Sequence, residues 1–393
     1  MRIGIDARLL DAKLHSGVEE YTINLLESIF KQDRANTYIL FYNAFNKELP
    51  DFITAMEKYP NVFVRRLFWP NKILNFLLFL FKYPKIDRLL DVPVLFTPNL
   101  NFTAWSRACK HLLTIHDFSF KIFPEFFDLK RKIWHWLVAP KKLIEKSDLI
   151  FTVSKTGQRD ILNFFTKTRQ KVLKSKFRIL YPIVDQQLKP VQKPGKLKRV
   201  LAKYQLNPGY LLVLGTFEPR KNLGALITAY AYLRKKGHTH TKLVITGKQG
   251  WLFKKTLDLI RASKFRNSIV FTGPIHRQDR SAIYSGAKLF IFPSIYEGFG
   301  YPPLEAMACS TPVISSQAGS LPEILGKSAL YFNPFFSREL AQAIIVLQKE
   351  KAYAKLLIQA GKKRVAKFQN NKSGRKFLKF VNQAINNRPG HAA

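Results

Sequence analysis

Cysteine and acidic residues are scarce in this chain of 393 residues. Its only cysteines, Cys109 and Cys309, lie in different halves of the sequence, which excludes a disulfide framework and a cysteine-based metal site. Reduced thiols suit the cytoplasm. The chain has 26 acidic and 65 basic residues, which gives a net charge of +39. Such a charge attracts nucleic acid, anionic lipid headgroups or polyphosphate ligands, and by itself it does not choose among them.

The sequence shows neither a long apolar run nor the pattern expected of a secretory leader. The most apolar stretch, residues 73–81, contains Asn75 and is flanked by Lys72 and Lys82, so it does not reach the roughly eighteen residues of a membrane span. At the N-terminus, Asp6 and Arg8 interrupt any apolar leader, and this segment is typical of a strand followed by a loop. We therefore expect a cytoplasmic protein that works at the inner face of the plasma membrane.

Basic residues mixed with aromatic ones predict peripheral contact with an anionic membrane through the N-terminal half. The stretch 130–142 combines Trp134 and Trp136 with lysine and arginine, and Trp69 and residues 73–81 add apolar side chains. The alternatives are a solvated basic helix face at 130–142 and a buried core helix at 73–81.

Short apolar runs alternate with helical stretches along the whole chain, the pattern of parallel sheets built from βαβ units. We expect strands at 2–6, 37–42, 61–66, 93–97, 112–115, 148–153 and 177–181, and a second series at 210–215, 242–247, 268–273, 288–293 and 312–315. With 47% hydrophobic residues, the chain is long enough for two cores. The predicted fold class is α/β, with two Rossmann-like doubly wound domains facing across a cleft.

The domain boundaries follow from these two series of strands. An N-terminal Rossmann-like domain covers residues 1–183, and a connection rich in proline and lysine covers 184–208. A second Rossmann-like domain then covers 209–370. We expect the C-terminal helix, 371–393, to cross back to the first domain.

The stretch 292–308 contains the most specific functional motif of the sequence. Glu297 and Glu305 stand eight residues apart around a Gly-x-Gly turn between a strand and a helix, and Gly298 and Gly300 allow a close approach of the backbone to a ligand. Amides at the helix start can take up negative charge, which suits a phosphorylated sugar. A carboxylate at Glu305 can accept hydrogen bonds from paired ribose hydroxyls, and Glu297 would lie nearer the sugar. A surface glutamate and a loop-bound glutamate are the alternative.

This stretch resembles the E-x7-E signature of retaining glycosyltransferase family 4, whose members have the GT-B fold. Further similar stretches occur in order: 3–8 with Gly17 and Tyr21, 114–118, 151–154 and 214–222, the last in the form common in mannosyl- and rhamnosyltransferase-like members. The resemblance implies donor-binding roles for Gly17, Gly215, Arg220, Lys221, Gly298, Phe299, Gly300 and Glu305. It implies catalytic roles for His116, Glu297, Arg220 and Lys221, with His116 contacting the transferred sugar.

Physically, Arg220 and Lys221 suit a diphosphate, because a guanidinium fork and a compact ammonium both stabilise leaving-group charge. No metal and no cofactor are then needed. The chain departs from the family at Thr216, where an arginine is common, and at Glu19, Ile183 and Ser310, where glycines are common. Ser154 is predicted to cap a helix.

The expected function is transfer of a hexose, mannose as the first choice, from a nucleotide diphosphate sugar such as GDP-mannose to a glycan or lipid-linked acceptor. The transfer would retain the anomeric configuration. A nucleotide-sugar epimerase or phosphorylase is the alternative enzyme, and a nucleic-acid-binding protein is the non-enzymatic alternative. The chain lacks the motifs of nucleic-acid-binding modules, so no specific nucleic acid is expected.

Overall fold

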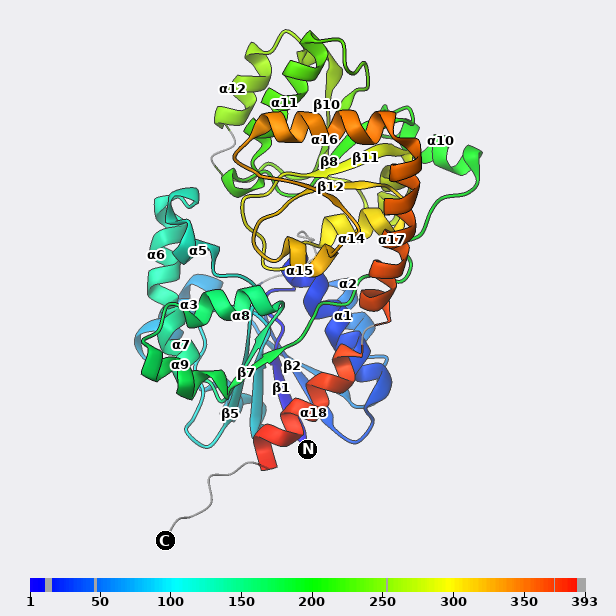
Figure 1. Cartoon of the computed structure of the whole chain (residues 1–393). Coiled ribbons are helices and arrows are strands. Elements are labelled where there is room, and N and C mark those ends of the chain that lie inside the picture. Colours follow the sequence, from blue (N-terminus) through cyan, green and yellow to red (C-terminus); the bar gives the residue numbers. More distant parts are fainter. Residues whose placement is uncertain (11–15, 46–47, 252–253, 371, 387–393) are drawn as a thin grey trace. The chain divides into compact units, whose positions relative to one another are not determined.

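The computed structural model describes residues 1–393 except 11–15, 46–47, 252–253, 371 and 387–393 (Figure 1). The chain divides into two compact units. Unit 1 comprises residues 1–118, 129–183 and 371–393, and unit 2 comprises 119–128 and 184–370. Each unit is a parallel sheet with helices, so the predicted α/β class of two Rossmann-like domains is confirmed.

Unit 1 has a 7-stranded parallel sheet of order β3-β2-β1-β4-β5-β6-β7. Its strands are β1 (Arg2–Asp6), β2 (Thr37–Asn43), β3 (Val62–Leu67), β4 (Val94–Thr97), β5 (Lys110–Ile115), β6 (Leu149–Thr152) and β7 (Phe177–Ile179). Its helices are α1 (Gly17–Gln32), α2 (Asp51–Met56), α3 (Asn71–Leu80), α4 (Ile86–Leu90), α6 (Leu129–Val138), α7 (Pro140–Lys146), α8 (Lys155–Leu162), α9 (Lys167–Lys174) and α18 (Ser373–Asn386). Every strand predicted for the first half of the chain is present. Ser154 caps α8 as predicted, accepting a hydrogen bond from the Gly157 amide.

Unit 2 has a 6-stranded parallel sheet of order β10-β9-β8-β11-β12-β13. Its strands are β8 (Tyr210–Leu214), β9 (Leu243–Thr246), β10 (Ile269–Gly273), β11 (Ala287–Phe292), β12 (Val313–Ser316) and β13 (Leu330–Phe332). Its helices are α5 (Ser119–Ile122), α10 (Pro194–Ala202), α11 (Leu223–Lys235), α12 (Lys254–Ala262), α13 (Arg280–Gly286), α14 (Tyr301–Ala308), α15 (Leu321–Leu325), α16 (Ser337–Lys349) and α17 (Lys351–Gln369), with short 3-10 turns between some of them. The sequence analysis missed β13.

Two boundaries differ from the sequence analysis. Residues 119–128, assigned to the first domain by their place in the chain, belong to unit 2. Their aromatic side chains find partners there: the rings of Phe123 and Tyr296 lie 5.8 Å apart, and the Trp251 indole N–H donates to the Phe126 carbonyl at 2.6 Å.

The predicted connection 184–208 is likewise a packed part of unit 2 rather than a linker. It forms α10, in which Leu201 is fully buried. A methyl group added at Gly286 of α13 would lie 2.8 Å from Leu201 Cδ1, so the two helices touch closely. Proline and lysine in this stretch mark the ends and the solvent face of a helix, not an unstructured chain.

After α17 the chain returns to unit 1 as α18 (Figure 1). The Ser373 hydroxyl donates to the Tyr181 carbonyl at 2.7 Å, and the Phe377 ring lies 4.9 Å from Phe96 and 5.3 Å from Phe151. The aromatic face of α18 is therefore part of the core of unit 1. Burial of such a side chain stabilises a fold by about 1.5–3 kcal/mol.

The strand order fixes where each sheet can hold a ligand. In unit 2, the chain runs from β8 outward to β9 and β10 and then returns to the other side of β8 as β11. The carboxyl ends of β8 and β11 therefore border a topological switch point, where open α/β sheets bind ligands. In unit 1 the same reversal lies between β1 and β4.

Candidate active site

A pocket lies at the switch point of unit 2. It is lined by the ends of β8 and β11 and by the loops that follow them: Val213, Leu214, Gly215, Thr216, Phe217, Lys221, Leu223, Phe292, Pro293 and Ser294. Gly215 and Lys221, both predicted to bind the donor, line this pocket. Arg220 and Glu297 are not among its lining residues.

The loop after β8 brings Arg220 and Lys221 to this end of the sheet in a short 3-10 turn, Pro219–Lys221. Asn222 ends that turn in the left-handed conformation, with φ of 54°, and its side-chain amide donates to the Pro293 and Pro334 carbonyls at 3.2 and 2.7 Å. The Ile295 amide donates to the Arg220 carbonyl at 2.8 Å. Backbone contacts therefore join the loop after β8 to the loop after β11.

The Glu297 carboxylate accepts hydrogen bonds from both basic side chains of the loop after β8. Its Oε1 accepts from Lys221 Nζ at 2.6 Å, and its Oε2 accepts from Arg220 Nη1 at 3.0 Å. Arg220 also donates from Nε to Glu218 at 2.5 Å and from Nη1 to the Tyr296 carbonyl at 3.2 Å. Burial raises the pKa of the Glu297 carboxyl, but the charges of Arg220 and Lys221 together outweigh it and lower that pKa. Glu297 is therefore an ionised, buried carboxylate at neutral pH.

The backbone of Glu297 is fixed from the loop after β12. The Ser320 amide and hydroxyl both donate to the Glu297 carbonyl, at 3.1 and 2.9 Å. Gly319 adopts φ of +56°, and a Cβ at this position would lie 2.7 Å from the Glu297 carbonyl oxygen and 2.8 Å from its amide nitrogen. Only a glycine permits this approach, so Gly319 and Ser320 position Glu297.

The Gly298–Gly300 turn leads into α14. Phe299, predicted to bind the donor, is buried with its ring 5.1 Å from Tyr301 and 5.4 Å from Phe368 of α17. This side chain is part of the apolar packing of unit 2, because α17 covers it. Gly298 is buried, and Gly300 caps α14 with φ of 92°.

The start of α14 also offers fewer amides than a helix start usually does. Its second and third residues are Pro302 and Pro303, which have no N–H group. Of the four amides that a helix start leaves unpaired, two are therefore missing here. Backbone donors for an anion are therefore limited to the two remaining amides and to the turn before the helix.

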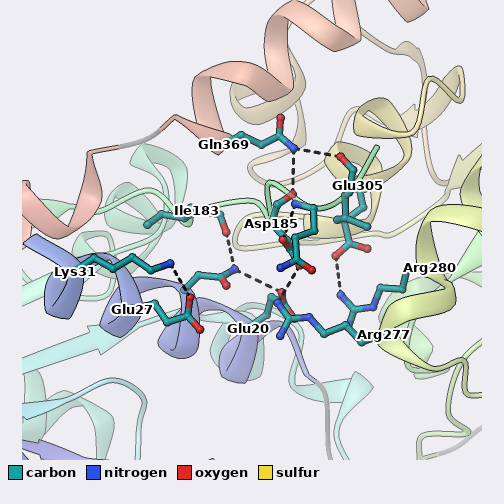
Figure 2. Close-up of polar contacts among 12 residues, drawn as sticks. Glu20, Glu27, Lys31, Ile183, Asp185, Arg277, Arg280, Glu305 and Gln369 are labelled. Atoms are coloured by element: carbon teal, nitrogen blue, oxygen red, sulfur yellow. Dashed lines mark hydrogen bonds and ion pairs between the residues drawn. The ribbon is translucent and has the colours of Figure 1, made fainter. Parts of the chain in front are cut away.

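Glu305 takes a separate set of partners from α13 (Figure 2). Its Oε1 accepts from Arg280 Nη1 at 3.2 Å, and its Oε2 accepts from the Tyr284 hydroxyl at 2.7 Å. Burial and the neighbouring Glu305 raise the pKa of Tyr284 well above its ordinary value, so the phenol keeps its proton and donates. These two contacts fix the orientation of the Glu305 carboxylate.

In unit 1, His116 follows β5 and is partly buried beside α1. Its Nε2 lies 2.8 Å from the Pro98 carbonyl, and its ring meets Tyr21 edge-on at 4.8 Å. Tyr21 in turn shares a 3.3 Å hydrogen bond with Thr114 of β5. Burial lowers the pKa of His116 to about 4, so the ring is neutral at pH 7. Because a carbonyl only accepts, Nε2 carries the proton and Nδ1 is left as an acceptor.

Gly17 is the first residue of α1. Ser16 caps the helix, and Glu19 closes a capping box by accepting the Ser16 amide at 2.6 Å. Glu19 therefore stands in place of a family glycine because it stabilises the helix start. At the other departure, Ser310 adopts φ of +61° after α14, a conformation that favours glycine.

The structure thus brings Arg220, Lys221 and Glu297 together, next to a pocket lined by Gly215. Glu305 lies on α14 against α13, and His116 and Gly17 belong to unit 1. The sequence analysis missed Glu218, Arg280, Tyr284, Ser294, Gly319 and Ser320. Gly319 and Ser320 follow the strand β12, and this Gly-Ser signal at the end of a parallel strand was available in the sequence. Nothing local in the sequence marks Arg280 or Tyr284, because their partner Glu305 is brought to them by packing of α13 on α14.

Comparison with known proteins finds similar sequences for part of the chain. Residues 198–364 match the family model of glycosyl transferases group 1. O-antigen chain mannosyltransferase B of Escherichia coli is 31% identical over 235 residues, 60% of each chain. Serotype-specific mannosyltransferase WbdA of Escherichia coli is 31% identical over 228 residues, 57% of this chain and 27% of that one. The matches thus cover about 60% or less of these curated relatives.

Solved structures match nearly the whole chain. Sucrose-phosphate synthase from Thermosynechococcus elongatus has a TM-score of 0.75 at 20% identity and covers 98% of this chain and 100% of its own. Anabaena Alr3699/HepE in complex with UDP-glucose has a TM-score of 0.70 at 16% identity, with 97% and 99% covered. The chain therefore shares the GT-B fold of these two proteins, and its residues 198–364 match the model of glycosyl transferases group 1.

The contact of Gly319 with Glu297 is tested by Gly319→Ala, with Gly237→Ala as a matched control. Both glycines have positive φ, +56° and +68°, but a Cβ at Gly237 meets nothing within 4 Å. Strain alone should cost each variant roughly 1–2 kcal/mol in the free energy of unfolding. The clash with Glu297 should cost Gly319→Ala a further ~1–3 kcal/mol, measured by urea unfolding. Equal losses in the free energy of unfolding of the two variants would show that close contact of Gly319 with Glu297 does not contribute to stability.

Proposed function

We propose that this protein is a retaining hexosyltransferase. It would transfer a hexose, mannose as the first choice, from a nucleotide diphosphate sugar to a glycan or lipid-linked acceptor, without a metal ion. One observation carries the proposal: Arg220 and Lys221 meet the buried Glu297 carboxylate at the switch point of the sheet, within the residues that match the group 1 model and beside a narrow pocket. This combination suits an anionic donor whose sugar must be oriented by hydrogen bonds.

Lys221 is the group best placed to hold the diphosphate. Its ammonium has three N–H donors, and Glu297 takes one of them at 2.6 Å. The other two can serve phosphate oxygens in the pocket. The Arg220 guanidinium, by contrast, donates hydrogen bonds to Glu218, Glu297 and the Tyr296 carbonyl. We therefore assign Arg220 chiefly to holding Glu297, and we assign Lys221 to the leaving group.

The proposed reaction breaks the bond between the anomeric carbon and the diphosphate oxygen, which leaves with the electron pair. The acceptor hydroxyl oxygen then bonds to the anomeric carbon on the same face, and its proton passes to the departing phosphate oxygen. Negative charge on that oxygen grows as the bond breaks, so Lys221 would stabilise the transition state more than the bound donor. Positioning of the two reactants supplies much of the remaining effect.

The remaining site residues would bind and orient the substrates. Glu297, an ionised acceptor, and the neutral Nδ1 of His116 are both suited to accept hydrogen bonds from sugar hydroxyls. The amide of Gly17 at the start of α1 is suited to an anionic donor group. Glu305, oriented by Arg280 and Tyr284, would take the two ribose hydroxyls.

The choice of mannose rests on the Glu-Pro-Arg-Lys-Asn stretch and on relatives whose names denote mannosyltransferases. A nucleotide-sugar epimerase or phosphorylase would use a similar donor pocket. The test is to incubate the protein with GDP-mannose and other nucleotide diphosphate hexoses, a chelator and an oligosaccharide acceptor, and to follow the anomeric signals by NMR. Transfer with the donor's anomeric configuration supports the proposal. Epimerised donor, sugar phosphate, inversion or loss of transfer with chelator would contradict it.

Lys221→Ala should reduce turnover more than donor binding. We expect kcat to fall by about 10²-fold or more, the scale for removing one group that stabilises a developing oxyanion, while the donor Kd rises by less than about tenfold. Single-turnover rates and calorimetric titration measure the two quantities. Lys236→Ala removes an exposed lysine after α11 and should change neither. Equal losses in kcat and binding would assign Lys221 to uniform binding instead.

Glu305→Gln should weaken binding of the donor nucleotide. A neutral amide is a poorer acceptor than a carboxylate, and the loss should be roughly 1.5–3 kcal/mol in binding free energy. The matched ligand is the same nucleotide with a 2′-deoxyribose, which lacks one of the two hydroxyls. The wild type should discriminate against it, and the variant should discriminate less. If a folded variant keeps the full preference for ribose, Glu305 serves only to join α13 to α14.

A further inference from the structure

Two helices of unit 1, α3 and α6, expose large apolar side chains to solvent. We call the following residues the α3–α6 surface: Phe68, Ile73, Phe76, Leu80, Phe81, Tyr83, Leu129, Ile133 and Trp136. Each is exposed in the structure, Trp136 by 76% and Leu129 by 72%. Single exposed apolar residues are ordinary, but a group of this size and aromatic content marks an interaction site.

The exposed residues form one stripe on each helix. In α3, Leu74 and Leu78 are fully buried, whereas Ile73, Phe76 and Leu80 point outward at the spacing i, i+3, i+7. In α6, Leu129, Ile133 and Trp136 are exposed at i, i+4, i+7. A surface helix normally carries polar residues on its outer face. Both of these helices carry apolar ones there instead.

The two helices are linked through Phe102. Its ring lies 6.1 Å from Phe79 of α3 and 6.2 Å from Trp134 of α6. Phe102 therefore contacts both helices, and the two stripes belong to the same region of unit 1. Trp69, which the sequence analysis counted as a surface contact, is partly buried and packs against the core beneath α3, so it is not part of this surface.

The two stretches that carry the α3–α6 surface contain only positive charges. Residues 68–86 contain Lys72, Lys82 and Lys85, and residues 129–144 contain Lys130, Arg131, Lys132, Lys141 and Lys142, with no acidic residue in either stretch. Burial and the positive charges of Lys146, Lys142 and Lys85 lower the pKa of Lys82. The end of α3 therefore lies near Lys142 and Lys146 of α7. The positive charge is thus concentrated beside the apolar stripes.

Exposed aromatic and aliphatic side chains bordered by lysines and arginines suit one partner in particular. The core of a protein interface is depleted of lysine, whereas an anionic bilayer accepts apolar side chains at the headgroup boundary and attracts flanking cations. Long basic side chains can reach phosphates while their stems lie on the apolar stripe. We propose that the α3–α6 surface docks unit 1 on an anionic lipid bilayer. This inference requires nothing about the sugar chemistry proposed for unit 2.

The test is flotation of the full-length protein with vesicles of phosphatidylcholine containing a third phosphatidylglycerol, and with phosphatidylcholine alone. We expect binding to the anionic vesicles at 0.1 M salt and much weaker binding at 0.5 M salt, because screening shortens the range of the attraction. Binding to neutral vesicles should be weaker at both salt concentrations. Trp136 fluorescence should be quenched by brominated lipid, which places the side chain at the bilayer. The other tryptophans are replaced by phenylalanine for this measurement.

Two variants separate the apolar from the charged contribution. Leu129→Ser with Trp136→Ser should lower vesicle affinity at least tenfold, whereas Phe335→Ser with Leu356→Ser, equally exposed in unit 2, should leave it unchanged. Lys130→Glu with Lys132→Glu should lower affinity by more than about 20-fold, since each lysine near the surface contributes about fivefold. Lys362→Glu with Lys363→Glu on α17 makes the same charge change elsewhere and should have a smaller effect.

Several outcomes would overturn the proposal. The first is no flotation with anionic vesicles at low salt, and the second is equal flotation with neutral ones. A third is equal losses in the α3–α6 variants and in their unit 2 controls, which would leave only a diffuse charge effect. A last one is concentration-dependent dimerisation that disappears with Leu129→Ser and Trp136→Ser, which would assign the surface to a second copy of the chain. Transfer activity with a water-soluble acceptor is measured in parallel, so failure of docking is distinguishable from failure of the proposed chemistry.

Discussion

A buried carboxylate, that of Glu297, organises the candidate site of unit 2. Taking an ionised carboxylate out of water is costly unless charged partners and hydrogen bonds surround it. Here Lys221 and Arg220 supply the charges, and Ser320 fixes the backbone at the same residue. Because Arg220 and Lys221 follow β8 and Glu297 follows β11, this one group joins the two loops that border the switch point. The pocket wall keeps its shape because those loops are held together.

A second buried carboxylate fixes a different pair of elements. Glu305 of α14 receives hydrogen bonds from Arg280 and Tyr284 of α13. Arg280 and Tyr284 lie one helical turn apart, so they reach the carboxylate from the same face of α13. The spacing of eight residues between Glu297 and Glu305 therefore places two acids in unlike surroundings. One is bound to two cations in a loop, and the other is bound to one cation and one phenol on a helix.

Unit 1 combines a neutral histidine with a basic, apolar outer surface. His116 is held by the Pro98 carbonyl and by Tyr21 of α1. A polar group that the sequence marks only by a short motif is thus fixed by neighbours from two other segments of the chain. Away from this cluster, α3 and α6 carry apolar side chains on their outer faces. No helix in the described ranges is long and apolar enough to cross a membrane.

The sequence by itself determined the two sheets, since buried parallel strands are continuous apolar runs that end in glycine, proline or serine. It also marked Arg220, Lys221 and Glu297, because they lie in loops that follow such strands, where ligands bind, and it marked Glu305 by its spacing of eight residues from Glu297. Tertiary structure alone decided which of these groups meet, and that α10 and residues 119–128 pack in unit 2. It also decided that Phe299 is a core residue and that Gly319 touches Glu297. These facts depend on contacts between residues far apart in the chain, and periodicity and spacing carry no information about such contacts.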